Sequence, residues 1–287
     1  MPLTWLVCST ESRPNVEPDI TIIGGGLSAI YAYWGCRDAG YEADQIEVLA
    51  SKMALPIGAI FMYETPIPWV ATPITSILLG TADLYSMNQW TKVVKTSAHT
   101  RFNNSQKTVT DYLYMYEEMA TTLWGMMPGL RNSHPISSVE LEQLKHERKA
   151  VICTFANTEY RQGYAEKGYI INFPIYINKV ETDKHIVLYN GLNTIPWVRQ
   201  TMVPGHQYTE YPNHIIGPII TQYENNRGNA DGQIHFAPDL MPNTPPLAWH
   251  ERIEDNLLRV GRLAAFKTGY LSHHARMDTK RFLMELV

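Results

Sequence analysis

Cysteine, charge and long apolar runs are all scarce in this sequence of 287 residues. The three cysteines, Cys8, Cys36 and Cys153, form no Cys-x-x-Cys pair, which argues against a disulfide framework or a dithiol relay and favours a reducing, cytoplasmic setting. The longest apolar stretch, residues 67–82, is interrupted by two prolines and is too short to cross a bilayer. Charged residues amount to 18% and the formal net charge is -4, so the overall charge attracts neither nucleic acid nor a membrane.

The motifs of several catalytic classes are missing as well. No Gly-x-Ser-x-Gly sequence is present, which argues against a serine hydrolase of the α/β class. Histidines such as His206 and His214 are scattered without the spacing of metal ligands, and the acidic residues form no spaced set either. We therefore expect no metal ion.

The most informative segment that is present runs from Asp19 to Ile30. A short β-branched run ends in three glycines and is followed by small and apolar residues, which is the order strand, tight turn, helix. A glycine permits the turn, a second leaves room for a pyrophosphate, and a small residue lets the helix pack on its strand, while amides that open the helix face the anion. The segment predicts a dinucleotide-binding βαβ unit. Its expected contacts are Gly24, Gly25, Gly26, Ser28 and Ala29.

The second strand of this unit is expected over residues 46–49, after a turn at Gly40. An acidic residue usually ends that strand and holds the ribose hydroxyls. Here the hydrophobic pattern puts Ala50 at that place, Ser51 is the nearest hydroxyl, and Glu47 comes too early in the strand. The pattern therefore leaves open how the adenosine half of a dinucleotide is held.

The rest of the chain alternates between loops, helices and strands. Residues 56–82 are rich in proline and glycine and predict a loop system over the ligand, and apolar positions at helical spacing predict a helix over Thr108–Met127. Ser137 and Glu140 form a capping box that predicts the start of another helix. Strands are expected over residues 151–155, 169–173, 175–177 and 185–189.

Three further segments resemble flavoproteins. Residues 51–59 resemble the loop that follows the second strand in the glutathione-reductase-like superfamily, where it passes along the FAD. Residues 190–197, with Thr-Ile-Pro, resemble the stretch in UDP-galactopyranose mutases and flavin amine oxidases where the chain returns from the substrate domain to the nucleotide domain. Residues 257–267 contain Val-Gly-Arg-Leu and resemble the last strand and helix of the same group, whose helix points its positive end at the flavin.

This resemblance implies FAD as the cofactor and an α/β fold, in which a Rossmann-like FAD-binding domain carries an inserted helical and β substrate domain. The implied ranges are 16–83 for the βαβ part, 84–245 for the substrate or lid region and 246–287 for the return to the FAD-binding domain. The further cofactor contacts that it implies are Ser51, Gly58, Thr194, Gly261, Arg262 and Leu263.

The resemblance also implies a reaction in which the flavin oxidises or cleaves a C–N bond of an amine or amino-acid-like substrate. Aromatic side chains commonly flank such a substrate, and a histidine near the flavin can accept its proton at neutral pH. The candidate catalytic residues are Tyr270, His273 and Lys267, with His274, Tyr189, Trp197 and Tyr63 as neighbours of the expected site.

Residues 259–281 hold six basic side chains against one acidic, a net charge of +5 in an acidic protein. This basic tail predicts a binding site for an anionic ligand, and the FAD phosphates would account for part of it. A more specialised prediction is that the tail contacts the backbone of DNA. Compact flavoenzymes of bacteriophages act on amino-acid-modified thymine, and a lean chain with a basic tail is similar to such an enzyme. Two other classes stay open: an S-adenosylmethionine-dependent methyltransferase and a non-catalytic nucleotide-binding protein. The sequence leaves the oligomeric state open.

Overall fold

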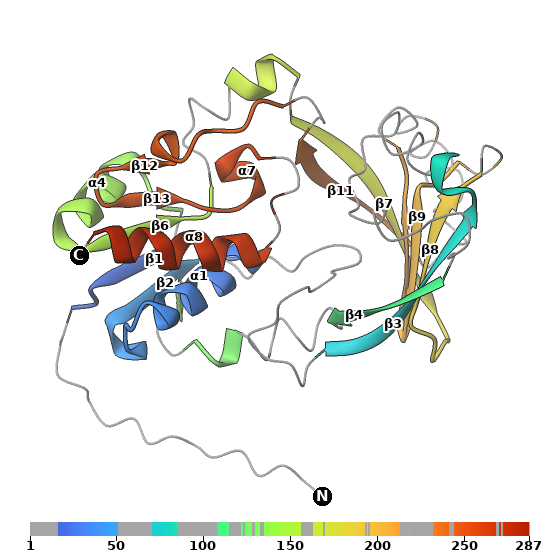
Figure 1. Cartoon of the computed structure of the whole chain (residues 1–287), viewed down its shortest axis with the longest axis horizontal. Helices are drawn as coiled ribbons and strands as arrows, with labels where there is room; N and C mark the ends of the chain where they lie inside the picture. Colours follow the sequence, from blue (N-terminus) through green and yellow to red (C-terminus); the bar gives the residue numbers. More distant parts are fainter. Residues whose placement is uncertain are drawn as a thin grey trace, which may run out of the picture.

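The chain forms two β-sheets that lie side by side, the first covered by helices and the second largely bare of them (Figure 1). The structure is a computed structural model. It describes residues 17–50, 71–84, 108–114, 122, 124–127, 130–132, 135–155, 163–168, 170–192, 194, 196–212, 218, 232–240, 244–267, 270 and 272–286.

The first sheet has six strands in the order β12-β13-β6-β1-β2-β5, and all its neighbours are parallel except β12 and β13. Strands β1, β6 and β13 are short and buried at every position, as expected of a parallel sheet covered on both faces. The strands are β1 Ile20–Ile23, β2 Ile46–Ala50, β5 Leu130–Asn132, β6 Ala150–Cys153, β12 Ile253–Glu254 and β13 Leu257–Arg259.

Helices cover both faces of this sheet (Figure 1). On one face, α1 and α8 pack together over a core that includes Ile22, Ile30 and Phe282. On the other face, α4 packs Leu141 and Leu144 against the sheet. The helical elements are α1 Leu27–Asp38, η1 Ala43–Gln45, α4 Ser138–Glu147, η5 His250–Arg252, α7 Arg262–Ala265 and α8 Ser272–Glu285.

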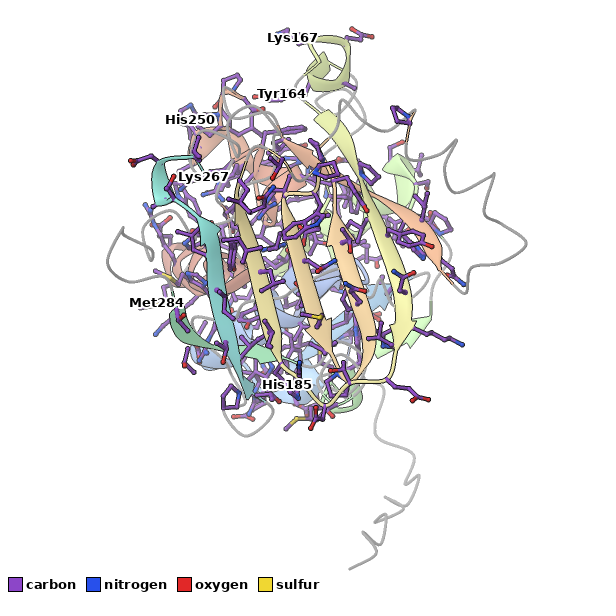
Figure 2. All side chains as sticks on the ribbon, turned by 90° about the vertical axis from the view of Figure 1, so that its right-hand side faces the viewer. Tyr164, Lys167, His185, His250, Lys267 and Met284 are labelled. Carbon is purple, nitrogen blue, oxygen red and sulfur yellow. The ribbon has the colours of Figure 1, made fainter. Side chains whose placement is uncertain are left out.

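The second sheet has seven strands in the order β11-β7-β10-β9-β8-β3-β4, and every neighbouring pair is antiparallel except β3 and β8. Figure 2 looks at this sheet face on. The strands are β3 Ala71–Gly80, β4 Thr108–Tyr114, β7 Ile170–Val180, β8 Ile186–Gly191, β9 Arg199–Val203, β10 Gly205–Glu210 and β11 Gln233–Leu240.

Local signals predict the first sheet well. Strand β2 and the β1–α1 turn lie where the sequence places them, and α4 begins at its predicted capping box. There the Glu140 amide donates to Ser137 Oγ over 3.2 Å, while the Ser137 amide donates to the Glu140 carboxylate over 2.8 Å. Each of these predictions depends on residues close in sequence, so the tertiary structure does not alter it.

Two predictions for the second sheet are wrong. Residues 71–80 form strand β3 instead of a loop, and Thr108–Tyr114 forms strand β4 instead of the first half of a helix. Farther along that predicted helix, Thr122, Trp124 and Gly125 are helical. The two strands pair with each other, so a long-range partner overrides the local helical spacing.

The two sheets do not follow the three predicted sequence ranges. The predicted substrate region, 84–245, contributes strands β5 and β6 to the first sheet and helix α4 to one of its faces. The predicted βαβ part, 16–83, contributes strand β3 to the second sheet. The chain therefore crosses between the sheets more often than one insertion requires. Strand order depends on pairing between distant segments, which the sequence pattern does not encode.

Candidate functional site

The candidate site lies at the carboxyl edge of the first sheet. Strand β1 stands between β2, which follows it through α1, and β6, which comes much later in the chain. The chain passes from β1 to β2 on one side and later crosses from β5 through α4 to β6 on the other side. In open α/β sheets ligands bind in the crevice where the strand order reverses in this way. Gly24 follows β1 there and Thr154 follows β6, and the Thr154 amide donates to the Ile23 carbonyl over 3.0 Å.

Gly24 has no room for a side chain. Its φ is +138°, and a Cβ at this position would lie 1.8 Å from Thr154 Oγ1. That hydroxyl in turn donates to the Ile23 carbonyl over 3.0 Å. Thr154 was not among the predicted site residues, because the predicted strand over residues 151–155 contains it, whereas the observed strand β6 ends one residue before it, at Cys153.

Gly26 caps the first turn of α1 and faces open space. Its φ is -107°, and no heavy atom of the described residues lies within 4 Å of the place a Cβ would take. No described side chain caps the helix, and its first turn holds no acidic residue. Amides at a helix N-terminus lack partners inside the helix, so this opening suits an anion.

Gly261, which lies near the other end of the sequence, reaches the same crevice as Gly24 and Gly26. It is buried with a φ of +103°, and a Cβ there would lie 2.8 Å from Ser28 Oγ and 3.7 Å from the Thr154 carbonyl oxygen. The turn after β13 thus packs directly on the first turn of α1. The two glycine turns, one from each end of the sequence, converge at one crevice.

The helix after Gly261 is shorter than predicted. Helix α7 spans four residues and ends at Phe266, a buried residue in the left-handed region with a φ of 45°. A helix of one turn contributes little macrodipole, so any stabilisation of an anion here would come mainly from the amides that open the turn. What remains at the site is the turn itself, with Arg262 and Leu263 half-buried beside it.

Leu263 and Phe266 join the two sheets. Leu263 packs on a cluster of Phe266, Leu247 and Leu240, the last residue of β11. The Phe266 ring stacks on Tyr164 at 3.8 Å between centroids. In Figure 2, Tyr164 and Lys267 lie at the same end of the molecule. Lys267 itself is exposed, directly after the Phe266 bend.

Tyr270, a candidate catalytic residue, makes a buried hydrogen bond through its hydroxyl. Its side chain is buried, with 3% of its surface exposed, and its hydroxyl donates to Asp278 Oδ2 over 2.7 Å. Burial first, and then the Asp278 carboxylate, raise the pKa of this phenol above its ordinary value. The hydroxyl therefore stays protonated and committed to Asp278.

The two candidate histidines lie together at the start of α8. The rings of His273 and His274 are 4.2 Å apart between centroids, and His274 meets the edge of Tyr270 at 5.3 Å. Both side chains are half-buried. They flank the Tyr270 that packs behind the Gly261 turn.

The Thr-Ile-Pro segment lies elsewhere than expected. Thr194 is exposed in the connection between β8 and β9, which pair with each other, so the chain stays in the second sheet there and does not return to the nucleotide-binding part. Tyr189 is buried within β8, and the Trp197 carbonyl accepts a 2.7 Å hydrogen bond from Asn190. The remaining candidates lie outside the described residues: Ser51, Gly58 and Tyr63.

Glu47 has a structural role. It is buried on β2, where it accepts a 3.0 Å hydrogen bond from Thr21 Oγ1, and Arg148 donates to the same hydroxyl over 3.2 Å. Ala50 ends β2 and is buried. The place of the usual ribose-binding acid is therefore taken by alanine, as the hydrophobic pattern indicates.

The other chemistry of the described residues is limited. Cys36 and Cys153 are free and buried, and burial raises the pKa of Cys153 to about 12, so its thiol is unreactive at neutral pH. Within the described ranges no three His, Cys, Asp or Glu side chains are grouped to hold a metal ion. No helix in that part of the chain has the length and apolar character needed to cross a membrane.

The first sheet is mostly parallel, and two glycine turns meet at its switch point. The second sheet beside it is mostly antiparallel. Together these features define a two-sheet α/β protein of the nucleotide-binding kind. No protein-family model and no curated protein matches the sequence. Solved structures do match. Reduced UDP-galactopyranose mutase aligns with 94% of this chain and 95% of its own, at a TM-score of 0.52 and 13% identity.

Two halogenases share the same arrangement. The tryptophan 5-halogenase MibH aligns with 97% of this chain at a TM-score of 0.54 and 13% identity, over 67% of its own length. CmlS, a flavin-dependent halogenase, aligns with 95% of this chain at a TM-score of 0.50 and 10% identity, and the chain spans 58% of its length. At these identities the likeness establishes the fold, and it confirms the predicted Rossmann-like α/β class.

Proposed function

We propose that the chain is an FAD-dependent oxidoreductase that holds its cofactor at the carboxyl edge of the first sheet. The observation that carries this proposal is the contact of Gly261 with Ser28, beside Thr154. A nucleotide site of one βαβ unit needs only the Gly24–Gly26 turn. A second buried glycine turn, delivered to the same crevice from the other end of the sequence, fits a longer dinucleotide that reaches past the first turn.

The residues present suit the pyrophosphate of FAD. Gly26 leaves open space where a phosphate oxygen would approach, and the amides of the first α1 turn supply donors. Bound FAD would supply a two-electron acceptor for a hydride from carbon. The chain's own contribution is to orient the cofactor through the two turns and, through the Leu263–Phe266 cluster, to fix the second sheet beside it.

The substrate proposal is an amine or amino-acid-like molecule, from which a C–N bond is oxidised or cleaved. It is supported by the sequence resemblance to flavin amine oxidases. His273 and His274 are the candidates for accepting the substrate proton, since both are half-buried at the start of α8. Tyr270 and Tyr189 are buried, so an aromatic cage would have to use other side chains.

A small substrate is better supported than modified thymine in DNA. Three of the six basic side chains of the tail are paired within the chain. Arg259 pairs with Glu254 at 2.8 Å, Arg276 with Asp38 at 2.6 Å and Arg281 with Glu285 at 2.7 Å. Their charge is largely neutralised locally, which weakens a DNA-binding surface.

The direct test is the absorbance spectrum of the cofactor released from the purified, denatured protein. We expect the spectrum of FAD, whereas S-adenosylmethionine would support the methyltransferase alternative. A preparation without flavin that also fails to bind added FAD would overturn the proposal.

A pair of glycine variants locates the site. In Gly26→Ala the new methyl group occupies the space left for the pyrophosphate, so we expect FAD to bind about tenfold more weakly or worse, by isothermal titration of the apoprotein. Gly163→Ala is the matched control, because Gly163 likewise has open space around it and lies outside the crevice. Equal FAD affinity in the two variants would place the cofactor elsewhere.

The substrate class is tested separately. Adding a panel of primary amines and amino acids under argon should bleach the flavin absorbance for at least one member if the C–N proposal holds. A flavin that no amine reduces, but that binds normally, would favour the non-catalytic alternative.

A further inference from the structure

A cavity lies at the amino edge of the first sheet, opposite the glycine crevice. It is bordered by the residues that directly precede three parallel strands: Asp19 before β1, Gln45 before β2 and Lys149 before β6. Its volume is about 450 Å³, within the range of roughly 300–1,000 Å³ that small-molecule pockets occupy. Because the glycine crevice follows the carboxyl ends of β1 and β6, this cavity is a separate site.

Lys149 brings a positive charge to the cavity. Its Nζ lies over the Tyr41 ring, 5.1 Å from the ring centroid, and it makes no ion pair with any residue that the structure describes. Tyr41 also lines the cavity and is buried, and its hydroxyl meets no hydrogen-bond partner in the described ranges. The face of a ring attracts a cation but does not neutralise it, so the ammonium remains able to bind an anion.

Asp19 brings the opposite charge to the same cavity. Its carboxylate Oδ2 accepts a 2.8 Å hydrogen bond from Gln45 Nε2, and its main-chain carbonyl accepts one of 2.8 Å from the Lys149 amide. The side chain is half-buried, and among the described residues no cation forms an ion pair with it. The backbone bond thus holds Asp19 and Lys149 side by side, while their side chains present two separate charges.

The remaining wall of the cavity is mostly apolar. Leu283 of α8 has 1% of its surface exposed, whereas the next residue, Met284, has 64% exposed. Apolar surface therefore extends from the interior to the outside of the protein. Gly40, which follows α1, keeps the opposite side open, because a Cβ there would lie more than 4 Å from every described heavy atom.

We propose that this cavity binds a zwitterionic amino acid with an apolar side chain: Lys149 binds its carboxylate, Asp19 its ammonium group, and Leu283 and Met284 its side chain. A ligand that carries both charges satisfies both residues at once. A simple anion would instead meet the Asp19 carboxylate, and a simple amine the Lys149 ammonium, and like charges at short range repel. The proposal goes beyond the FAD site, because the cavity shares no residue with the glycine crevice and needs no cofactor.

The first test compares three ligands by isothermal titration of the purified protein. L-leucine carries both charges, N-acetyl-leucine only the negative one, and leucinamide only the positive one. We expect leucine to bind and each blocked form to bind at least about tenfold more weakly, since each loses one charge-assisted contact. No binding of leucine at millimolar concentrations overturns the proposal. A blocked form that binds as tightly as leucine overturns the assignment of a zwitterion.

The second test uses variants of the two charged residues. Lys149→Gln and Asp19→Asn each remove one charge at nearly constant size, and we expect each to weaken leucine binding about tenfold. Lys280→Gln is the matched control, because Lys280 is an exposed lysine of α8 that does not line the cavity. Either cavity variant with the leucine affinity of Lys280→Gln would contradict the assignment of that contact.

Leucine bound at the crevice must be distinguished from leucine bound here, because the proposed substrate is also amino-acid-like. Gly26→Ala is expected to weaken FAD binding and to leave leucine binding unchanged. If Gly26→Ala loses leucine binding while Lys149→Gln keeps it, the amino acid binds at the crevice and the second site is overturned. If the protein binds leucine here but no FAD, the cofactor proposal alone fails.

Discussion

The two sheets place their polar groups in different ways. In the first sheet the crevice is formed by turns with glycines, and the ion pair between Arg259 of β13 and Glu254 of β12 lies at the rim, with Glu254 exposed. In the second sheet Arg199 of β9 binds Glu210 of β10 inside the protein, with 12% and 1% of these side chains exposed. Backbone shape therefore forms the crevice of the first sheet, whereas a buried ion pair joins β9 to β10 in the second.

The largest effect is expected from breaking the buried pair. Arg199→Ala leaves the Glu210 carboxylate buried without its main cation, which should lower the free energy of unfolding by about 3 to 5 kcal/mol. Urea denaturation measures the loss. The double change Arg199→Met with Glu210→Leu removes both charges and should recover most of it, and a double variant as unstable as Arg199→Ala would show that packing, not charge, is what matters there.

A smaller but still large effect is expected at the glycine of the first sheet. Gly24→Ala places a methyl group on Thr154 Oγ1 in a backbone conformation that L residues avoid, so we expect a loss of about 3 kcal/mol in the free energy of unfolding. Thermal unfolding of the apoprotein measures it, with Gly26→Ala as the control that should lose less than about 1 kcal/mol. Equal losses would mean that the backbone at Gly24 relaxes freely.

The contrast between the sheets also explains what the sequence predicts. The Gly24–Gly26 turn, strand β2 and the Ser137 capping box depend on neighbours within a few residues, and all three lie where they were predicted. Strand β4 depends on its partner β3, and its apolar spacing alone favoured a helix. Local patterns did predict β7 and β8 of the second sheet, whereas β3 and β4 depend on long-range pairing that such patterns do not reveal.

In the candidate site, too, some residues could be predicted from the sequence and others could not. Its glycines could be predicted because a positive φ or a close approach selects glycine at Gly24 and Gly261. The sequence does not indicate that Tyr270 hydrogen-bonds Asp278, eight residues later. Thr154 follows strand β6, whose place beside β1 is set by the topology of the sheet. The contacts of these two side chains could therefore be assigned only once the fold was known.

A further test concerns the cap of α4, which covers one face of the first sheet. Ser137→Ala removes the acceptor for the Glu140 amide, and the free energy of unfolding should fall by about 1 kcal/mol. Chemical denaturation of this variant beside Ser137→Asp, which keeps an acceptor, checks the expectation. If the aspartate variant is no more stable than the alanine variant, the capping interpretation is wrong.

The smallest effect is expected from the exposed ion pair, and it depends on pH. Hydrogen bonds from Arg259 first and Lys145 second lower the pKa of Glu254 below its ordinary value of 4.5. A carboxyl with a lowered pKa stabilises the folded state above about pH 4.5, and this contribution disappears as the pH falls through the folded-state pKa.

Glu254→Gln should therefore reduce stability at neutral pH by less than about 1 kcal/mol, since solvent screens the pair. At strongly acidic pH the parent and the variant should unfold together. The midpoints of urea unfolding at the two pH values measure the difference, and a gap of the same size at both would rule out the Glu254 charge as its source.

The convergence of Gly24 and Gly261 has a consequence for biosynthesis. The first turn leaves the ribosome early, but its counterpart emerges only after almost the whole of both sheets has been translated. If FAD needs both turns, it cannot be captured by the growing polypeptide, and loading must wait until the segment after β13 docks. Nascent molecules would then pass through a cofactor-free stage in which the crevice has only one wall.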